Sequence, residues 1–135
     1  MDLEKKIKDL EKSVNRLKEA YEKTVEHRGD EEYQFFRDSA IWRFKFTVEI
    51  LWKSLKGFLY EVEGINCKSP KGCIREFFSS GYISPEETTN LLEMIDSRNK
   101  TSHTYHEEIA EEIFLELKEY IPLIEKVLNI ISSKR

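Results

Sequence analysis

Apolar residues recur at spacings of three and four along most of this chain, and this periodicity constrains its fold more than any other feature. The clearest stripe consists of Leu3, Ile7, Leu10, Val14, Leu17 and Tyr21. The positions between are mainly Lys and Glu, which form the solvated face of an amphipathic helix over roughly residues 2–26. The chain has only five Gly and three Pro in 135 residues, too few for a turn-rich β-sandwich. The sequence therefore predicts an all-α protein.

A second helix is expected between Glu31 and Glu63, because this stretch contains no Pro and a single Gly, Gly57. Its apolar residues form a broad stripe: Phe35, Phe36, Ile41, Trp42, Phe46, Ile50, Leu51, Leu55, Phe58 and Leu59. Such a stripe is typical of a central helix that touches several neighbours. The helical spacing accordingly favours core packing over base stacking for Trp42, Trp52 and the phenylalanines.

Two further helices have clear start signals. Ser69-Pro70 and Ser84-Pro85 each place a capping residue before a Pro at the first helical position. Glu87 completes a capping box with Ser84. The sequence thus predicts a short helix after Ser69, which closes near Gly81, and a longer helix after Ser84.

A last helix is expected after Thr104, which is predicted to form a capping box with Glu107. Pro122 should kink or split this helix, because proline lacks the amide hydrogen that the helix needs. No repeat or interdomain linker interrupts the chain. The expected architecture is one domain, residues 1–135, folded as an antiparallel, up-and-down four-helix bundle with one additional short helix.

The net charge of −4, from 22 basic and 26 acidic side chains, argues against a general coating surface for nucleic acid. A local basic groove is still compatible with this sum, because binding responds to the local field. Its candidate members are Arg43, Lys45, Arg75 and Lys100.

The two cysteines, Cys67 and Cys73, follow a C-x5-C spacing that matches no common zinc or redox pattern. They are expected to be free thiols in a reducing compartment. The first residues contain no apolar signal region, and no stretch approaches the ~20 apolar residues that span a bilayer. A cytoplasmic protein without a membrane partner is therefore expected.

The segment from Arg98 to Tyr105 departs from the pattern around it. The apolar stripe of Leu91, Leu92 and Ile95 continues at helical spacing into Arg98 and Asn99, where an apolar residue is expected. Burying such groups without partners is costly, so a cleft or an interface is expected here.

His103 lies five residues after Arg98, about 140° away on an ideal helix. The two side chains can meet only if the helix ends or distorts near Ser102, or if a second subunit completes the site. Arginine offers a planar fork of donors to phosphate oxygens, and histidine serves as a general acid or base near neutral pH. No cluster at metal-ligand spacing accompanies them, so neither a metal nor another cofactor is expected. A simpler interpretation stays open, in which Arg98 pairs with Asp96 or Glu93 and His103 caps a helix end.

The string R-N-K-T-S-H-T-Y, residues 98–105, resembles the R-x4-H-x-Y signature of the HepT family in the HEPN superfamily. Members of this family are also called nucleotidyltransferase substrate-binding proteins. The similarity covers nearly the whole chain and includes residues 43–49, 52–55, 69–70, 74–76 and 81–83. One departure is His106, where relatives often have an acidic residue; a surface histidine at a helix start is the favoured interpretation.

The resemblance implies a homodimeric toxin that cleaves RNA without a metal at a cleft between the two subunits. By this resemblance Arg98 stabilises charge on the phosphate, His103 transfers the proton, and Asn99 orients the phosphate or its neighbours. The implied partner is an MNT-type nucleotidyltransferase antitoxin, which adds AMP to Tyr105. The added phosphates would bring negative charge and bulk to the place where RNA phosphates bind.

Two other functions remain open from the residues. The chain is alternatively a non-catalytic nucleotide- or substrate-binding subunit of a split nucleotidyltransferase, in which Arg98 holds a phosphate. The presence of His103 favours catalysis, because phosphate binding alone needs no group that titrates near neutral pH. A structural helical adaptor is the third possibility, and it leaves the Arg98–Tyr105 string unexplained.

Overall fold

Helices make up all the regular structure of the computed structural model, which describes residues 2–134. The elements are α1 (Leu3–Glu26), α2 (Tyr33–Phe58), α3 (Pro70–Ser79), α4 (Pro85–Asn99) and α5 (Glu107–Lys134). A π-helical turn, η1 (Leu59–Glu63), extends α2, and a 3₁₀ turn, η2 (Lys100–His103), extends α4. The predicted all-α class is confirmed.

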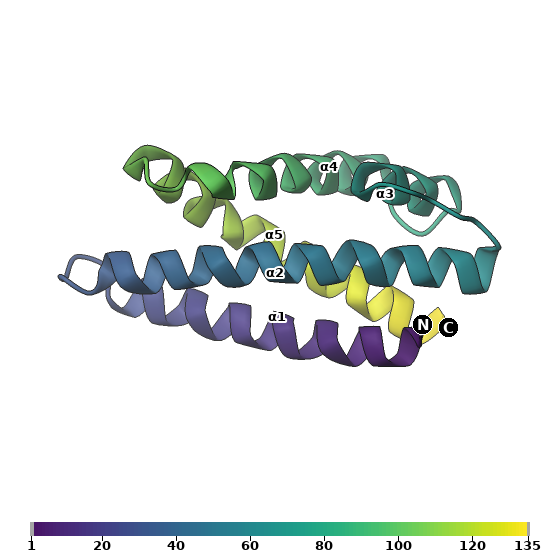
Figure 1. Ribbon diagram of the computed structural model, residues 1–135, viewed down its shortest axis with the longest axis horizontal. Helices are drawn as coiled ribbons and strands as arrows, with labels where there is room; N and C mark the ends of the chain where they lie inside the picture. Colours follow the sequence, from purple (N-terminus) through teal and green to yellow (C-terminus); the bar gives the residue numbers. More distant parts are fainter. Residues whose placement is uncertain (1, 135) are drawn as a thin grey trace.

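The four long helices α1, α2, α4 and α5 run alternately in opposite directions along the bundle (Figure 1). Helix α1 packs along α2, and α5 crosses the bundle to contact α1, α2 and α4. The short helix α3 lies against α4 and α2. This is the expected four-helix bundle with one additional short helix. Both termini lie at one end of its long axis, and the connection between α4 and α5 lies at the other (Figure 1).

Capping and apolar spacing explain most helix limits. The predicted apolar stripe of α1 is buried from Leu3 to Leu17. The Ser69 hydroxyl accepts a hydrogen bond from the Gly72 amide, 3.0 Å away, at the start of α3. At the start of α4, the Ser84 and Glu87 side chains each accept a hydrogen bond from the other residue's backbone amide. These caps confirm the predicted starts of both helices.

The predicted core packing of the α2 aromatics is wrong for three of them. Phe35, Trp42 and Phe46 are 77%, 57% and 50% exposed. They lie seven and four residues apart and therefore share one face of the helix. We call these three residues the α2 aromatic stripe. They are exposed because α2 buries its opposite side, including Ile41 and Phe44, against the rest of the bundle.

The predicted capping box at Thr104 is also wrong. The Thr104 hydroxyl donates to the carbonyl oxygen of Thr101, 3.1 Å away, and the Glu107 carboxylate binds Arg37 instead. The backbone of Thr104 has φ −73° and ψ −2°, whereas an N-cap residue is usually extended. The 3₁₀ turn thus carries the chain past Thr104 before α5 begins at Glu107.

The expected free thiols form a disulfide instead. Cys67 and Cys73 are bonded, with their Cα atoms 5.1 Å apart, and both residues are buried. The chain from residue 64 to residue 69 has no regular secondary structure and leads into α3, which brings the two cysteines together. The disulfide ties the approach to α3 to the first turn of that helix.

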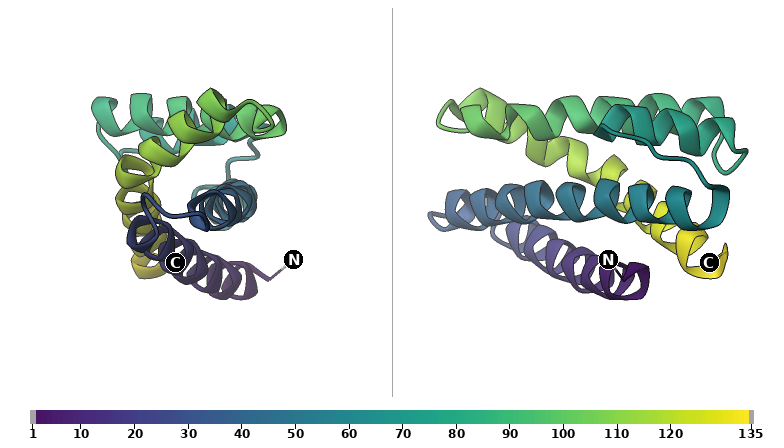
Figure 2. Two further views of the ribbon diagram at one scale, coloured as in Figure 1. Left: turned by 90° about the vertical axis from the view of Figure 1, so that its left-hand side faces the viewer. Right: turned by 45° about the vertical axis from the view of Figure 1, so that its right-hand side comes forward.

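Pro122 does not split α5, which continues for 28 residues, although its axis changes direction along its length (Figure 2). Proline removes one backbone hydrogen bond and crowds the preceding turn, but packing on both sides retains the helix. Among the described helices, none is long and apolar enough to cross a membrane.

Candidate functional site

The predicted site residues lie at the end of α4 and on the connection between α4 and α5, at the end of the bundle away from the termini (Figure 1). Helix α4 ends at Asn99, and the next four residues form the 3₁₀ turn η2. A 3₁₀ turn has about three residues per turn instead of 3.6, so side-chain directions shift relative to α4. The regular α-helix therefore ends before His103. This is one of the two conditions under which the Arg98 and His103 side chains can meet.

Arg98 is half-buried and held by α2. Its Nη2 atom lies 3.2 Å from Glu49 Oε1, and its Nη1 donates to Asn99 Oδ1 at 3.3 Å. The same Glu49 carboxylate accepts from Trp52 Nε1 at 3.2 Å. A carboxylate partner for Arg98 was expected, but it is Glu49 and not Asp96, which pairs with Lys71. The Arg98 fork is therefore oriented from the neighbouring helix.

His103 and Tyr105 form a second group, which points into solvent. The two ring centroids are 6.3 Å apart, and Tyr105 is 76% exposed. The ring of His106 lies 4.3 Å from that of Tyr105, at the start of α5 as expected for a surface histidine. Within residues 2–134, the His103 side chain makes no hydrogen bond, and no polar contact joins it to Arg98. One chain thus presents Arg98 with Asn99, and His103 with Tyr105, as two adjacent groups.

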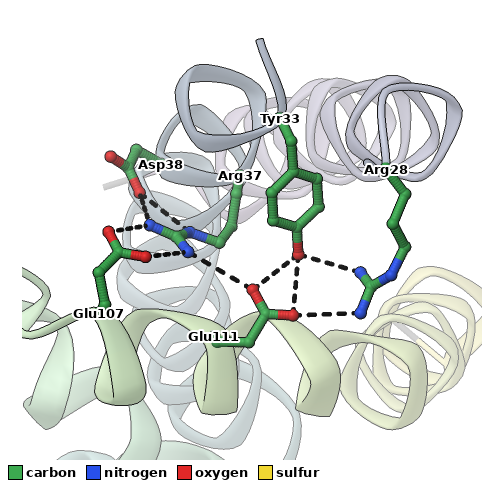
Figure 3. A network of polar contacts seen from close by, with 6 residues as sticks. All are labelled: Arg28, Tyr33, Arg37, Asp38, Glu107 and Glu111. Carbon is green, nitrogen blue, oxygen red and sulfur yellow. Dashed lines mark hydrogen bonds and ion pairs between the residues drawn. The ribbon is translucent and has the colours of Figure 1, made fainter. Parts of the chain in front are cut away.

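The first turns of α5, which follow these residues, bind α2 through a polar network that the sequence did not predict (Figure 3). Its centre is Arg37 of α2, whose side chain is 3% exposed. Arg37 donates to both carboxylate oxygens of Glu107 at 2.8 and 2.9 Å, and also to Asp38 and Glu111. The hydrogen bond from Arg37 holds the pKa of Glu107 below its ordinary value.

Glu111 extends the network towards the α1–α2 turn. It accepts from the Tyr33 hydroxyl at 2.7 Å and from Arg28 Nη2 at 3.1 Å (Figure 3). Burial, reinforced by the hydrogen bond to the Glu111 carboxylate, raises the pKa of Tyr33 to about 12. We call Arg28, Tyr33, Arg37, Asp38, Glu107 and Glu111 the Arg37 network.

A signal for Arg37 exists in the sequence. It lies three and four residues before Ala40 and Ile41, which are both buried, so it continues the buried stripe of α2. A charged residue on such a stripe indicates an ion pair inside the bundle, because burial without a partner is costly. Glu49 carries no comparable signal, since half-buried polar positions on α2 are common.

Two hollows of the surface are lined by residues other than the predicted site residues. A cavity of 550 Å³ between α4 and α5 is lined by residues that include Glu93, Glu116 and Lys126, not by the Arg98–Tyr105 segment. Of the candidate basic residues, Arg43 lines a smaller hollow beside Arg16. No group of three or more potential metal ligands is present among the described residues.

Comparison with known proteins places the chain in a family. Residues 5–133 match the model of the family described as nucleotidyltransferase substrate binding protein like. The chain belongs to this family, and its resemblance to HepT-like proteins is confirmed. No curated protein matches the sequence.

Solved structures show the same fold. A Thermus thermophilus protein is 38% identical with a TM-score of 0.81, over 90% of this chain and 98% of that one. A Haemophilus influenzae protein, described as a substrate binding domain of a nucleotidyltransferase, is 19% identical with a TM-score of 0.68, over 96% of each chain. A tri-AMPylated Shewanella oneidensis HEPN toxin, solved in complex with an MNT antitoxin, is 16% identical with a TM-score of 0.72, over 98% of this chain and 99% of that one.

Proposed function

We propose that this chain is a metal-independent endoribonuclease, the toxin of a HepT/MNT-type toxin–antitoxin pair. The observation that carries the proposal is the end of α4 with the connection that follows it, where Arg98 with Asn99, and His103 with Tyr105, lie as two neighbouring groups along the chain. The fold shared with the Shewanella oneidensis HEPN toxin supports the assignment.

The proposed reaction uses groups at the end of α4 and in the connection that follows it, together with solvent water. The ribose 2′-oxygen forms a bond to phosphorus while the bond from phosphorus to the 5′-oxygen breaks. The 2′-hydroxyl loses its proton and the 5′-oxygen gains one, which gives a 2′,3′-cyclic phosphate and a 5′-hydroxyl. His103 transfers one of these protons and solvent water transfers the other, while the Arg98 fork binds the non-bridging oxygens as their charge increases. Asn99, in contact with Arg98 Nη1, orients the guanidinium or the phosphate.

The functional unit in this proposal is a homodimer whose Arg98–His103 cleft binds RNA. Within one chain Arg98 and His103 make no polar contact. In the proposed dimer, the Arg98 of each copy and the His103 of the other face the same RNA phosphate across the cleft. The α2 aromatic stripe supports this arrangement, because it is an exposed apolar surface on the helix that also holds Arg98 through Glu49.

Cleavage assays in EDTA test the nuclease assignment. We expect purified protein to cut RNA, and His103→Ala and Arg98→Ala to lower kcat about 100-fold or more. The matched control is His106→Ala, which removes an adjacent exposed histidine and should keep most activity. Equal cleavage by His103→Ala and the wild type contradicts the catalytic role.

Tyr105 is the proposed acceptor for AMP from an MNT-type nucleotidyltransferase. Its phenolic oxygen attacks the α-phosphorus of ATP, pyrophosphate leaves, and the phenolic proton is released. Exposure of 76% makes the hydroxyl accessible to a partner enzyme. Mass spectrometry after incubation with the partner and ATP should show added AMP on the wild type and none on Tyr105→Phe. Unchanged labelling of Tyr105→Phe moves the acceptor to another residue.

A second candidate function is a non-catalytic nucleotide-binding subunit of a split nucleotidyltransferase. The description of the family, and that of the Haemophilus influenzae relative, favour it. In this function Arg98 binds a nucleotide phosphate and His103 has no proton to transfer. Tight ATP binding without RNA cleavage by any variant supports this alternative over the nuclease.

A further inference from the structure

The connection from Asn99 to His106 packs its 3₁₀ turn η2 against α2 and α5, but few polar contacts of its own fix its place on the bundle. All its side chains are exposed or half-buried. Its hydrogen bonds stay local, as between the Thr104 hydroxyl and the Thr101 carbonyl. Within the described chain, none of its side chains forms a hydrogen bond or ion pair with another helix. The position of His103 and Tyr105 therefore depends on how the two ends of the connection are held.

Both ends are tied to the same helix, α2. Arg98 precedes the connection and pairs with Glu49 at 3.2 Å. Glu107 follows it and receives two hydrogen bonds from Arg37 at 2.8 and 2.9 Å. Arg37 and Glu49 are twelve residues apart on α2, about 18 Å along its axis. Helix α2 thus holds the chain on both sides of the connection, through Glu49 before it and through Arg37 after it.

The tie at Glu107 is the stronger of the two. The Arg37 side chain is only 3% exposed, and it binds Glu107 through both terminal nitrogens (Figure 3). Asp38 and Glu111 accept its remaining donors, and the Tyr33 ring lies 5.8 Å from its guanidinium carbon. A bidentate pair fixes direction as well as distance. The negative charge of Glu107 is also stabilised by the positive, N-terminal end of the α5 dipole.

We propose that Arg37 is a positioning residue for the candidate nuclease site, and that it acts through Glu107. Glu107 is two residues after Tyr105 and four after His103, so a shift of the first turn of α5 moves both side chains. A displacement of about 1 Å at a catalytic group is enough to reduce rate substantially. The part of this inference that concerns catalysis rests on the proposed function, whereas the restraint on the connection does not.

The test compares Glu107→Gln with Glu108→Gln. Both variants remove one carboxylate from the first turn of α5, but within the described residues Glu108 has no hydrogen-bond or ion-pair partner. We expect amide hydrogen exchange of peptides covering residues 99–110 to become about fivefold faster in Glu107→Gln, and to stay near the wild-type rate in Glu108→Gln. Peptides from α1 should exchange equally in all three proteins.

RNA cleavage supplies the second measurement. Glu107→Gln should lower kcat about tenfold with little change in KM, because the RNA-binding groups remain while their alignment is lost. Equal exchange over residues 99–110 in the two variants overturns the inference. So does faster exchange of Glu107→Gln throughout the bundle, since that outcome indicates a general role in stability. If the wild type cleaves no RNA, the proposed function fails, and the exchange comparison still decides whether Arg37 restrains the connection.

Discussion

The Glu49 carboxylate is the charge in closest contact with Arg98. It lies 3.2 Å from the guanidinium and, through Trp52 Nε1, is itself held in place. A phosphate that approaches Arg98 must share the guanidinium with this carboxylate or displace it. Glu49 therefore has two opposing effects: it orients the Arg98 fork, and its negative charge weakens the attraction of that fork for RNA.

Substitution of Glu49 by Gln separates these effects. The neutral amide removes the repulsion, and we expect KM for RNA to fall about threefold. It also loosens the alignment of Arg98, and kcat should fall about tenfold. Glu61→Gln is the control, because Glu61 is exposed and lies in η1, outside the α4–α5 connection. Steady-state kinetics measure both constants, and a variant with unchanged kcat contradicts the orienting role of Glu49.

At the scale of elements, the sequence predicts helices better than it predicts their surroundings. The Ser-Pro starts at Ser69 and Ser84 are local, because hydroxyl and amide lie within three residues, and both are present. The exposure of Trp42 is not local, since it depends on which side of α2 the other helices cover. The Arg98–Tyr105 segment was found by its motif, but its partner Glu49 comes from a distant helix.

The disulfide is an element-scale feature that spacing alone did not predict. Because it closes a short loop in the unfolded chain, the disulfide should raise the free energy of unfolding by about 2 kcal/mol. Urea unfolding with reductant should therefore give a free energy of unfolding lower by this amount than urea unfolding without reductant. The same loss is expected for Cys67→Ser without reductant, because Cys73 then has no partner. Two reactive thiols per chain in the unreduced, unfolded protein contradict the bond.

On the scale of the whole molecule, the exposed α2 aromatic stripe is the surface that the proposed homodimer would cover. Trp42 and Phe46 are at least half exposed, and their rings already contact each other edge to face at 4.8 Å. Lys45 lies 5.7 Å from the Trp42 ring centre. Buried aromatic residues of this kind contribute much of the binding energy in protein interfaces.

If the stripe lies in the homodimer interface, Trp42→Ser and Phe46→Ser should each raise the dimer dissociation constant about 30-fold or more. Sedimentation velocity over a range of concentrations measures this change. Phe78→Ser is the matched control: Phe78 is also an exposed phenylalanine, at 39%, but it lies on α3 and not on α2. Each stripe variant should unfold close to the wild-type urea concentration, because at least half of its side chain is in solvent within one chain. Since the proposed cleft is formed by two copies, RNA cleavage should fall together with the dimer fraction and recover at high protein concentration. A dissociation constant that matches the Phe78→Ser control excludes the stripe from the interface.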